Sequence, residues 1–214
     1  MKTTEITKII EQNAQQIINN IDIESIELYK ILKREFEKSD VSENHKFQSA
    51  FSRFYGLDNV GFNEDFKSKY FKLLENYRNL DTFDVEKVFI DLHIIKNFKD
   101  KDSIIFSFAS KLMCTVDDSL PIYDKEVCDV FSFTEPVDDD FAMVIDILLD
   151  QYEGIQNLFK EIIDWNLLPI TFRLFDEKFK GNNLSLTKKL DFIFWSLGKL
   201  KIFKNPIEQI KVLN

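Results

Sequence analysis

The chain has 214 residues, of which 44% are hydrophobic and 30% charged, with 5 Gly, 4 Pro and a net charge of −9. This length suffices for one large domain whose core needs no metal or disulfide, and so few turn-forming residues argue against a sandwich or barrel of many short strands. The net acidity argues against a surface that is basic all over and holds nucleic acid everywhere, but it is compatible with a local basic face.

Apolar residues recur at helical spacing along nearly the whole chain. This pattern predicts an all-α fold, a multi-helix bundle with about nine or more helices and no sheet. Two opening helices should be separated near Asp22. The aromatic stretch from Phe47 to Tyr55 should end at Gly56 as a C-terminal glycine, and Asn63 should cap the helix that follows.

The central and C-terminal parts of the chain continue this pattern. A helix should start at Asp81 or Thr82, and Ser103 should open a central helix that ends near Val116, because turn-forming residues and a proline follow. Asp124 can cap a short helix. Further helices are predicted after the acidic run 138–140, with one around 143–148, others over 155–165, 170–180 and 185–202, and a last one opened by Asn205 and Pro206.

No internal repeat, low-complexity linker or change of composition divides the sequence, so residues 1–214 are predicted to form a single helical domain. Residues 1–20 lack the unbroken apolar run of a signal peptide or membrane span, which predicts a cytoplasmic protein with no membrane contact. Cys114 and Cys128 have no neighbouring His, since His45 and His93 are far away in sequence. We therefore expect two reduced thiols in or beside the core, no metal and no cofactor.

Residues 106–129 are the one segment whose residue types point to chemistry. Lys111 should lie late on one helix and Asp124 at the start of the next, so both should face the cleft between those helices. Lys111 borders an apolar stripe, where desolvation would lower the pKa of its amine and make it a nucleophile. Each residue also has a purely structural interpretation: the lysine can snorkel from the edge of the core, and the aspartate can serve only as a helix cap.

The motifs Ser107–Leu112, Leu120–Val127 and Lys189–Gly198 resemble a family of bacterial proteins related to 8-oxoguanine DNA glycosylases, at the margin of the helix-hairpin-helix glycosylase superfamily. The resemblance implies a helix-hairpin-helix glycosylase-like bundle. By the same resemblance, Lys111 would attack the sugar carbon of a flipped nucleotide and Asp124 would assist loss of the base. The implied partner is duplex DNA with a damaged or modified base.

Two further groups of residues fit this hypothesis. Aromatic side chains that can line a pocket for the base are Phe51, Tyr55, Tyr123 and Trp195. Lysines that can form a DNA-facing patch are Lys99, Lys101, Lys125, Lys199, Lys201 and Lys204. The structural alternative is that the aromatic residues belong to the core and the lysines to ordinary exposed helix faces.

A second function hypothesis comes from what the motifs lack. Residues 99–109 contain no glycine where the superfamily has a Gly-x-Gly turn that binds a phosphate. Together with the net acidity, this favours a non-catalytic helical interaction module on a glycosylase-like scaffold, with a protein partner in phage defence or regulation. The presence of Lys111 and Asp124 favours the enzyme.

Overall fold

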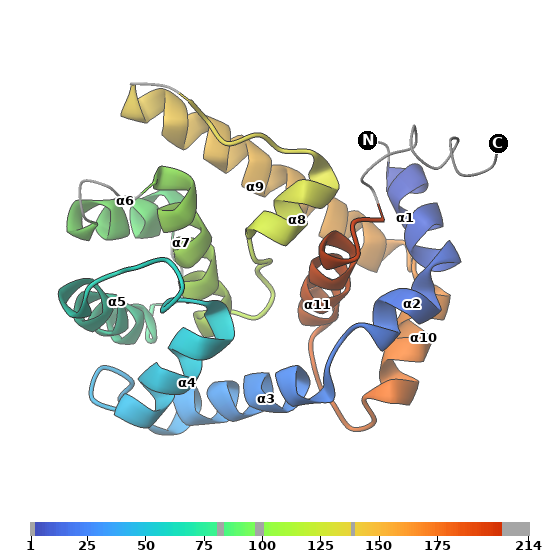
Figure 1. Ribbon diagram of the computed structural model, residues 1–214, viewed down its shortest axis with the longest axis horizontal. Coiled ribbons are helices and arrows are strands. Elements are labelled where there is room, and N and C mark those ends of the chain that lie inside the picture. Colours follow the sequence, from blue (N-terminus) through green and yellow to red (C-terminus); the bar gives the residue numbers. More distant parts are fainter. Residues whose placement is uncertain (1–2, 81–83, 97–100, 138–139, 203–214) are drawn as a thin grey trace.

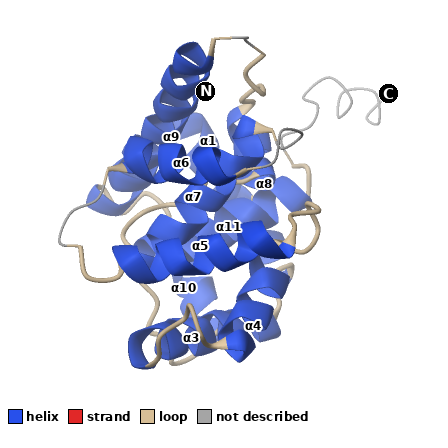
Figure 2. Ribbon diagram, turned by 90° about the vertical axis from the view of Figure 1, so that its left-hand side faces the viewer, coloured by secondary structure: helices blue, strands red, loops and turns tan. Residues whose placement is uncertain are grey.

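The computed structural model describes residues 3–80, 84–96, 101–137 and 140–202, and this part of the chain contains eleven helices and no strand (Figures 1 and 2). The prediction of an all-α fold is confirmed for these residues. Their buried apolar side chains form one hydrophobic core. The predicted limits of the domain, 1 and 214, lie outside the described residues.

The N-terminal segment differs from the prediction at one point. Instead of one helix up to Asp22, it has α1 (Thr3–Gln12) and α2 (Ala14–Asn19), with α3 (Ile23–Lys38) after them. The break is at Asn13, whose side-chain amide donates to the Ile9 carbonyl at 2.8 Å. An Asn side chain that bonds to nearby backbone competes with the regular helical pattern, which explains why an otherwise helical sequence is interrupted here.

The end of the next helix and the start of the one after it lie where they were predicted. These two helices are α4 (His45–Tyr55) and α5 (Glu64–Tyr77). Gly56 ends α4 in the left-handed region at φ +75°, which a glycine adopts without steric cost. The side chain of Asn63 accepts a hydrogen bond from the Phe66 N–H at 2.8 Å and so caps α5.

The middle of the chain holds α6 (Val85–Ile95), α7 (Asp102–Val116) and α8 (Lys125–Phe131). Asp84 caps α6, whereas Asp81 and Thr82 lie outside the described residues. The central helix α7 begins one residue before the predicted Ser103, because Lys101 is already the extended residue that precedes it. Its end at Val116 is confirmed.

The last three helices are α9 (Phe141–Asp164), α10 (Pro169–Lys178) and α11 (Leu186–Lys199). The prediction of two helices over 143–148 and 155–165 is wrong, because α9 is continuous through Gly154. A glycine inside a helix costs only about 1 kcal/mol relative to alanine, and the buried apolar face that runs the length of α9 outweighs this cost. Residues 205 and 206 lie outside the described part of the chain.

The beginning and the end of the described chain pack together. Helix α10 packs against α1 and α2, and α11 lies between α2 and α8 (Figure 1). The Ser196 hydroxyl on α11 donates to the Ile17 carbonyl at 2.7 Å. The long helix α9 contacts α6, α7, α11 and α1 and so connects both parts of the molecule. No helix among the described residues has the length and apolar character that crossing a membrane requires.

Candidate active site

A cavity with a volume of about 800 Å³ is lined by α4, α7, α8 and α11 together with the start of α3. Because α4 and α11 are far apart in sequence, this cavity exists only in the folded chain. It brings together eight of the residues singled out in the sequence, namely Tyr55, Lys101, Lys111, Tyr123, Asp124, Lys125, Trp195 and Lys199.

Lys111 lies in the wall of the cavity rather than at the edge of the core. Its side chain belongs to a continuous buried run on α7, and only 8% of the residue is exposed. The amine donates to the Ser107 hydroxyl at 3.1 Å and lies 4.5 Å from the centre of the Phe108 ring. Burial lowers the pKa of the Lys111 amine, while the nearby Asp124 carboxylate opposes that shift. This amine is therefore not a snorkelling group in free contact with water.

Asp124 caps α8 and lines the same cavity. Its carboxylate accepts the Val127 N–H at 3.0 Å, which confirms the predicted cap. Burial raises the pKa of this carboxyl, and the Lys111 ammonium and the Val127 N–H oppose the shift. No hydrogen bond or ion pair joins Lys111 to Asp124 in the described part of the chain. Both groups consequently remain available to a molecule in the cavity.

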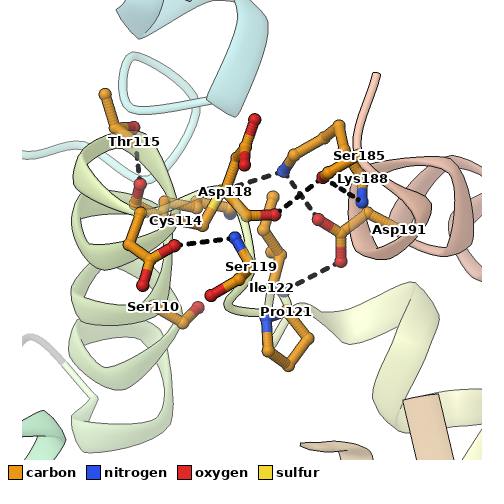
Figure 3. A network of polar contacts seen from close by, with 12 residues as sticks. Ser110, Cys114, Thr115, Asp118, Ser119, Pro121, Ile122, Ser185, Lys188 and Asp191 are labelled. Atoms are coloured by element: carbon orange, nitrogen blue, oxygen red, sulfur yellow. Dashed lines mark hydrogen bonds and ion pairs between the residues drawn. The ribbon is translucent and has the colours of Figure 1, made fainter. Parts of the chain in front are cut away.

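The two residues before Asp124 are held from both sides by side chains that the sequence did not indicate. The Ile122 N–H donates to the Asp191 carboxylate of α11 at 2.9 Å (Figure 3). The Tyr123 N–H donates to the Ser110 hydroxyl of α7 at 2.9 Å. Since Ser110 directly precedes Lys111, this second bond ties the segment that leads into Asp124 to the helix that carries the amine.

Asp191 belongs to a buried polar network on the wall of the cavity. The Lys188 ammonium donates to Asp191 at 2.6 Å and to the Cys114 sulfur at 2.9 Å (Figure 3). Lys188 is 1% exposed. Burial by itself lowers the pKa of this lysine, but the adjacent Asp191 carboxylate raises it well above its ordinary value. Lys188 is therefore a charged partner of Asp191 and not a second nucleophile.

The aromatic residues proposed as a base pocket have different environments. Phe51 is fully buried among other rings and does not line the cavity. Tyr55 and Tyr123 line the cavity but are buried. Trp195 is half-buried and lines it, and so does Phe54, which the sequence did not single out. Phe133 also lines the cavity and is half-buried, so Trp195, Phe54 and Phe133 are the rings that a ligand can reach most readily.

We call the three exposed lysines at the mouth of the cavity, Lys101, Lys125 and Lys199, the rim lysines. Each forms an ion pair with a carboxylate that also lines the cavity, at 2.9 Å with Glu135, 2.8 Å with Asp129 and 2.7 Å with Glu126. The lining holds six acidic side chains (Asp22, Asp124, Glu126, Asp129, Glu135, Asp191) and six basic ones (Arg53, Lys101, Lys111, Lys125, Lys188, Lys199). The charged side chains that line the cavity are consequently balanced in number, and the DNA-facing patch of lysines stays a prediction.

The remaining lysines predicted to contact DNA are not placed at this mouth. Lys201 is exposed but does not line the cavity, and Lys99 and Lys204 lie outside the described residues. Arg53 is an exposed cation at the cavity that forms no ion pair with any described residue. It had not been singled out, because a single arginine on a helix carries no pattern.

The cysteines offer no alternative nucleophile. Both are free and buried, as predicted. Cys128 lines the cavity, but burial raises the pKa of its thiol to about 12, and thiolate is the reactive form. Among the described residues, no group of His, Cys, Asp and Glu side chains is arranged to hold a metal ion.

The position of α8 depends on Gly198. A Cβ atom built on Gly198 would overlap the backbone carbonyl of Glu126, so α11 and α8 can approach this closely only at a glycine. We expect Gly198→Ala to lower the free energy of unfolding by about 1–3 kcal/mol, the usual cost of overpacking.

Thermal and urea unfolding measure this effect, and Gly154→Ala is the matched control. A Cβ on Gly154 meets its nearest neighbour, the end of the Phe133 ring, at 3.5 Å, which is ordinary contact. That control should be neutral or more stable by about 0.5–1 kcal/mol, because alanine favours the helix. Equal stability of the two variants would contradict the close packing of α8 on α11.

The helix-hairpin-helix likeness stays a prediction, since what the structure adds is the all-helical fold and the geometry of this cavity. Comparisons of the chain with protein-family models, with curated proteins and with solved structures found no match.

Proposed function

We propose that this protein is a DNA base-excision glycosylase with lyase activity, which acts on a damaged or modified base through Lys111 and Asp124. The observation that carries the proposal is the shared cavity: a buried amine with a lowered pKa and a half-buried carboxylate line it without pairing to each other. Its volume of about 800 Å³ lies within the range of small-molecule sites. That space is suitable for a nucleotide turned out of a duplex.

The two groups can divide the chemistry between them. The neutral Lys111 amine attacks C1′ of the sugar, the bond from C1′ to the base breaks, and the base leaves with the bonding electron pair and takes up a proton. The Asp124 carboxylate stabilises the positive charge that develops on the sugar. The attached nitrogen then loses a proton, the bond from C1′ to the ring oxygen breaks with its electron pair going to that oxygen, and the oxygen takes up a proton. The nitrogen lone pair forms the double bond, which leaves a protonated imine between Lys111 and C1′. No metal is needed for these steps.

The walls of the cavity offer a place for the base. Trp195 and Phe54 are half-buried there, and an aromatic face can stack on any base that has left the duplex. The ammonium of Lys199 lies 5.4 Å from the centre of the Trp195 ring, which keeps a cation beside this face. The aromatic faces suit an aromatic base, and the nearby ammonium suits the phosphate to which the nucleotide is attached.

One observation favours a second candidate function, the non-catalytic interaction module. Every rim lysine already has a carboxylate partner, so DNA phosphates would have to displace Glu135, Asp129 and Glu126. A protein partner with charges of both signs would fit such a mouth without displacing them.

Borohydride trapping tests the proposed function, because a lysine imine is reduced to a permanent crosslink. The parent protein, mixed with duplex DNA that contains an abasic site and then reduced, should form a covalent protein–DNA adduct. Peptide mass mapping should place the adduct on Lys111. In a panel of duplexes that carry oxidised, alkylated or deaminated bases, at least one base should be released.

The pH dependence of trapping adds a second readout. The free amine is the attacking form, so the trapping rate should rise with pH and level off below 10.5, the ordinary pKa of lysine, because burial lowers the pKa of Lys111. An adduct on an exposed lysine, or no adduct and no released base over the whole panel, would refute the glycosylase and favour the interaction module.

A further inference from the structure

The segment that leads into Asp124 carries a hydrogen bond that local structure does not require. The Ile122 N–H lies just before α8, where water or a nearby turn could satisfy it. Instead it donates to Asp191, a residue 69 positions later in the chain, at 2.9 Å. Asp191 is 6% exposed and lines the same cavity as Asp124.

The Asp191 carboxylate is held rigidly in its place. Its second oxygen accepts from Lys188 at 2.6 Å, and the same ammonium also donates to the sulfur of Cys114 on α7. The Lys188 ammonium further lies 5.0 Å from the centre of the Tyr29 ring. A buried ion pair contributes little net stability, because a protein with apolar residues of the same size in its place is often equally stable. What the Lys188–Asp191 pair supplies is a fixed position for the Asp191 oxygen that accepts the hydrogen bond from the Ile122 N–H.

We propose that Asp191 is a positioning residue for the proposed glycosylase reaction: through the Ile122 N–H it fixes the residues that lead into Asp124, and so sets where the Asp124 carboxylate lies in the cavity. This inference rests on the proposed function. Ser110 holds Tyr123 from the α7 side, and Asp191 holds Ile122 from the α11 side. With both bonds made, the carboxylate is fixed relative to the Lys111 amine.

The side chain of Tyr152 adds a third support that does not depend on Asp191. Its hydroxyl donates to the Pro121 carbonyl at 3.0 Å from α9. The segment therefore remains folded against the core if the Asp191 bond is lost, and the expected result is a small displacement of Asp124 rather than unfolding. A displacement of about 1 Å at a reacting group can cost about 100-fold in rate.

The experiment compares two double variants that differ only in the two terminal groups of the side chain at position 191. Lys188→Met with Asp191→Asn removes both charges and keeps an oxygen that accepts the Ile122 N–H. Lys188→Met with Asp191→Leu has nearly the same shape but lacks that acceptor. Removing both charges together avoids a buried unpaired ion, which would itself unfold the protein.

Two rates are measured for each variant. One is single-turnover release of the base that the parent releases fastest from the duplex panel, and the other is borohydride trapping on a duplex with a preformed abasic site. The Leu variant should release the base about 100-fold more slowly than the Asn variant, because Asp124 is displaced. The two should trap at rates within about threefold of each other, because the aldehyde of an abasic site needs only the Lys111 amine. A general loss of structure would lower both rates together.

Each outcome decides the matter. Slow release with preserved trapping in the Leu variant alone supports the positioning role. Equal release by the two double variants, or a parallel loss of release and trapping, overturns it while leaving the glycosylase in place. A parent protein that neither traps nor releases a base overturns both the positioning role and the proposed function.

Discussion

Lys111→Gln is expected to abolish borohydride trapping on abasic duplex DNA, because the glutamine amide cannot form an imine. The fold should be preserved, since glutamine can keep the contact with Ser107 and lie along the Phe108 ring as the lysine does. Lys160→Gln is the matched control: Lys160 is an exposed residue of α9 that pairs with Asp164 and does not line the cavity. That variant should trap at the parental rate.

Asp124→Asn should give the complementary result. Asparagine caps a helix about as well as aspartate, so α8 should keep its start at Lys125 and the melting temperature should change little. The negative charge is lost, however, and base release should fall by about 100- to 1,000-fold. Trapping on a preformed abasic site should persist. If both variants release bases as fast as the parent, Lys111 is a buried structural lysine and Asp124 is only a cap.

Lys188→Met alone should produce the largest loss of stability. Removal of the ammonium leaves the Asp191 carboxylate buried without its charged partner. Removing one partner of a buried ion pair typically lowers the free energy of unfolding by about 3–5 kcal/mol. Urea unfolding at neutral pH measures this loss. Adding Asp191→Asn to Lys188→Met should recover most of the stability, because the unpaired charge is then gone.

The pH dependence of this variant has a defined sign. Burial already raises the pKa of Asp191 above its ordinary value of 3.8, and Lys188 opposes that shift. Loss of Lys188 should therefore raise the pKa of Asp191 further, so the deficit relative to the parent should shrink as the pH falls and the carboxyl is protonated. Lys189→Met provides the control, because its partner Asp176 is half exposed, and breaking such a pair should cost less than about 1 kcal/mol. Similar losses in the two methionine variants would show that burial of the Lys188–Asp191 pair is energetically unimportant.

The fold could be predicted from the sequence where the signal is local. Periodic apolar residues identified the helices, and Asn63, Gly56 and Asp124 mark helix ends because their side chains or their freedom of φ act on their own neighbours. The errors have a different origin. The continuity of α9 through Gly154 depends on packing along the whole helix, which outweighs a local preference.

The candidate site likewise has features that local sequence indicates and features that depend on contacts between distant parts of the chain. Lys111 and Asp124 were predicted to face one cleft because a short loop joins their helices. The Lys125–Asp129 pair was not predicted, although a spacing of four residues on one helix favours such a pair. Asp191 could not be assigned its contact with Ile122, because no local pattern connects residues so far apart in the chain. For the same reason, the carboxylates that neutralise Lys101 and Lys199 were not foreseen.

The packing of α2 against α11 has a consequence for how the cavity forms during folding. The Ser196 hydroxyl bonds to the Ile17 carbonyl across a separation of 179 residues, so α2 and α11 meet only after a very large loop has closed. Loop closure of this size costs entropy before the contacts that repay it are made, and contacts so distant in sequence slow folding. We therefore expect Lys111 and Asp124, which are close in sequence, to come together early, and the contact between α2 and α11 to form late.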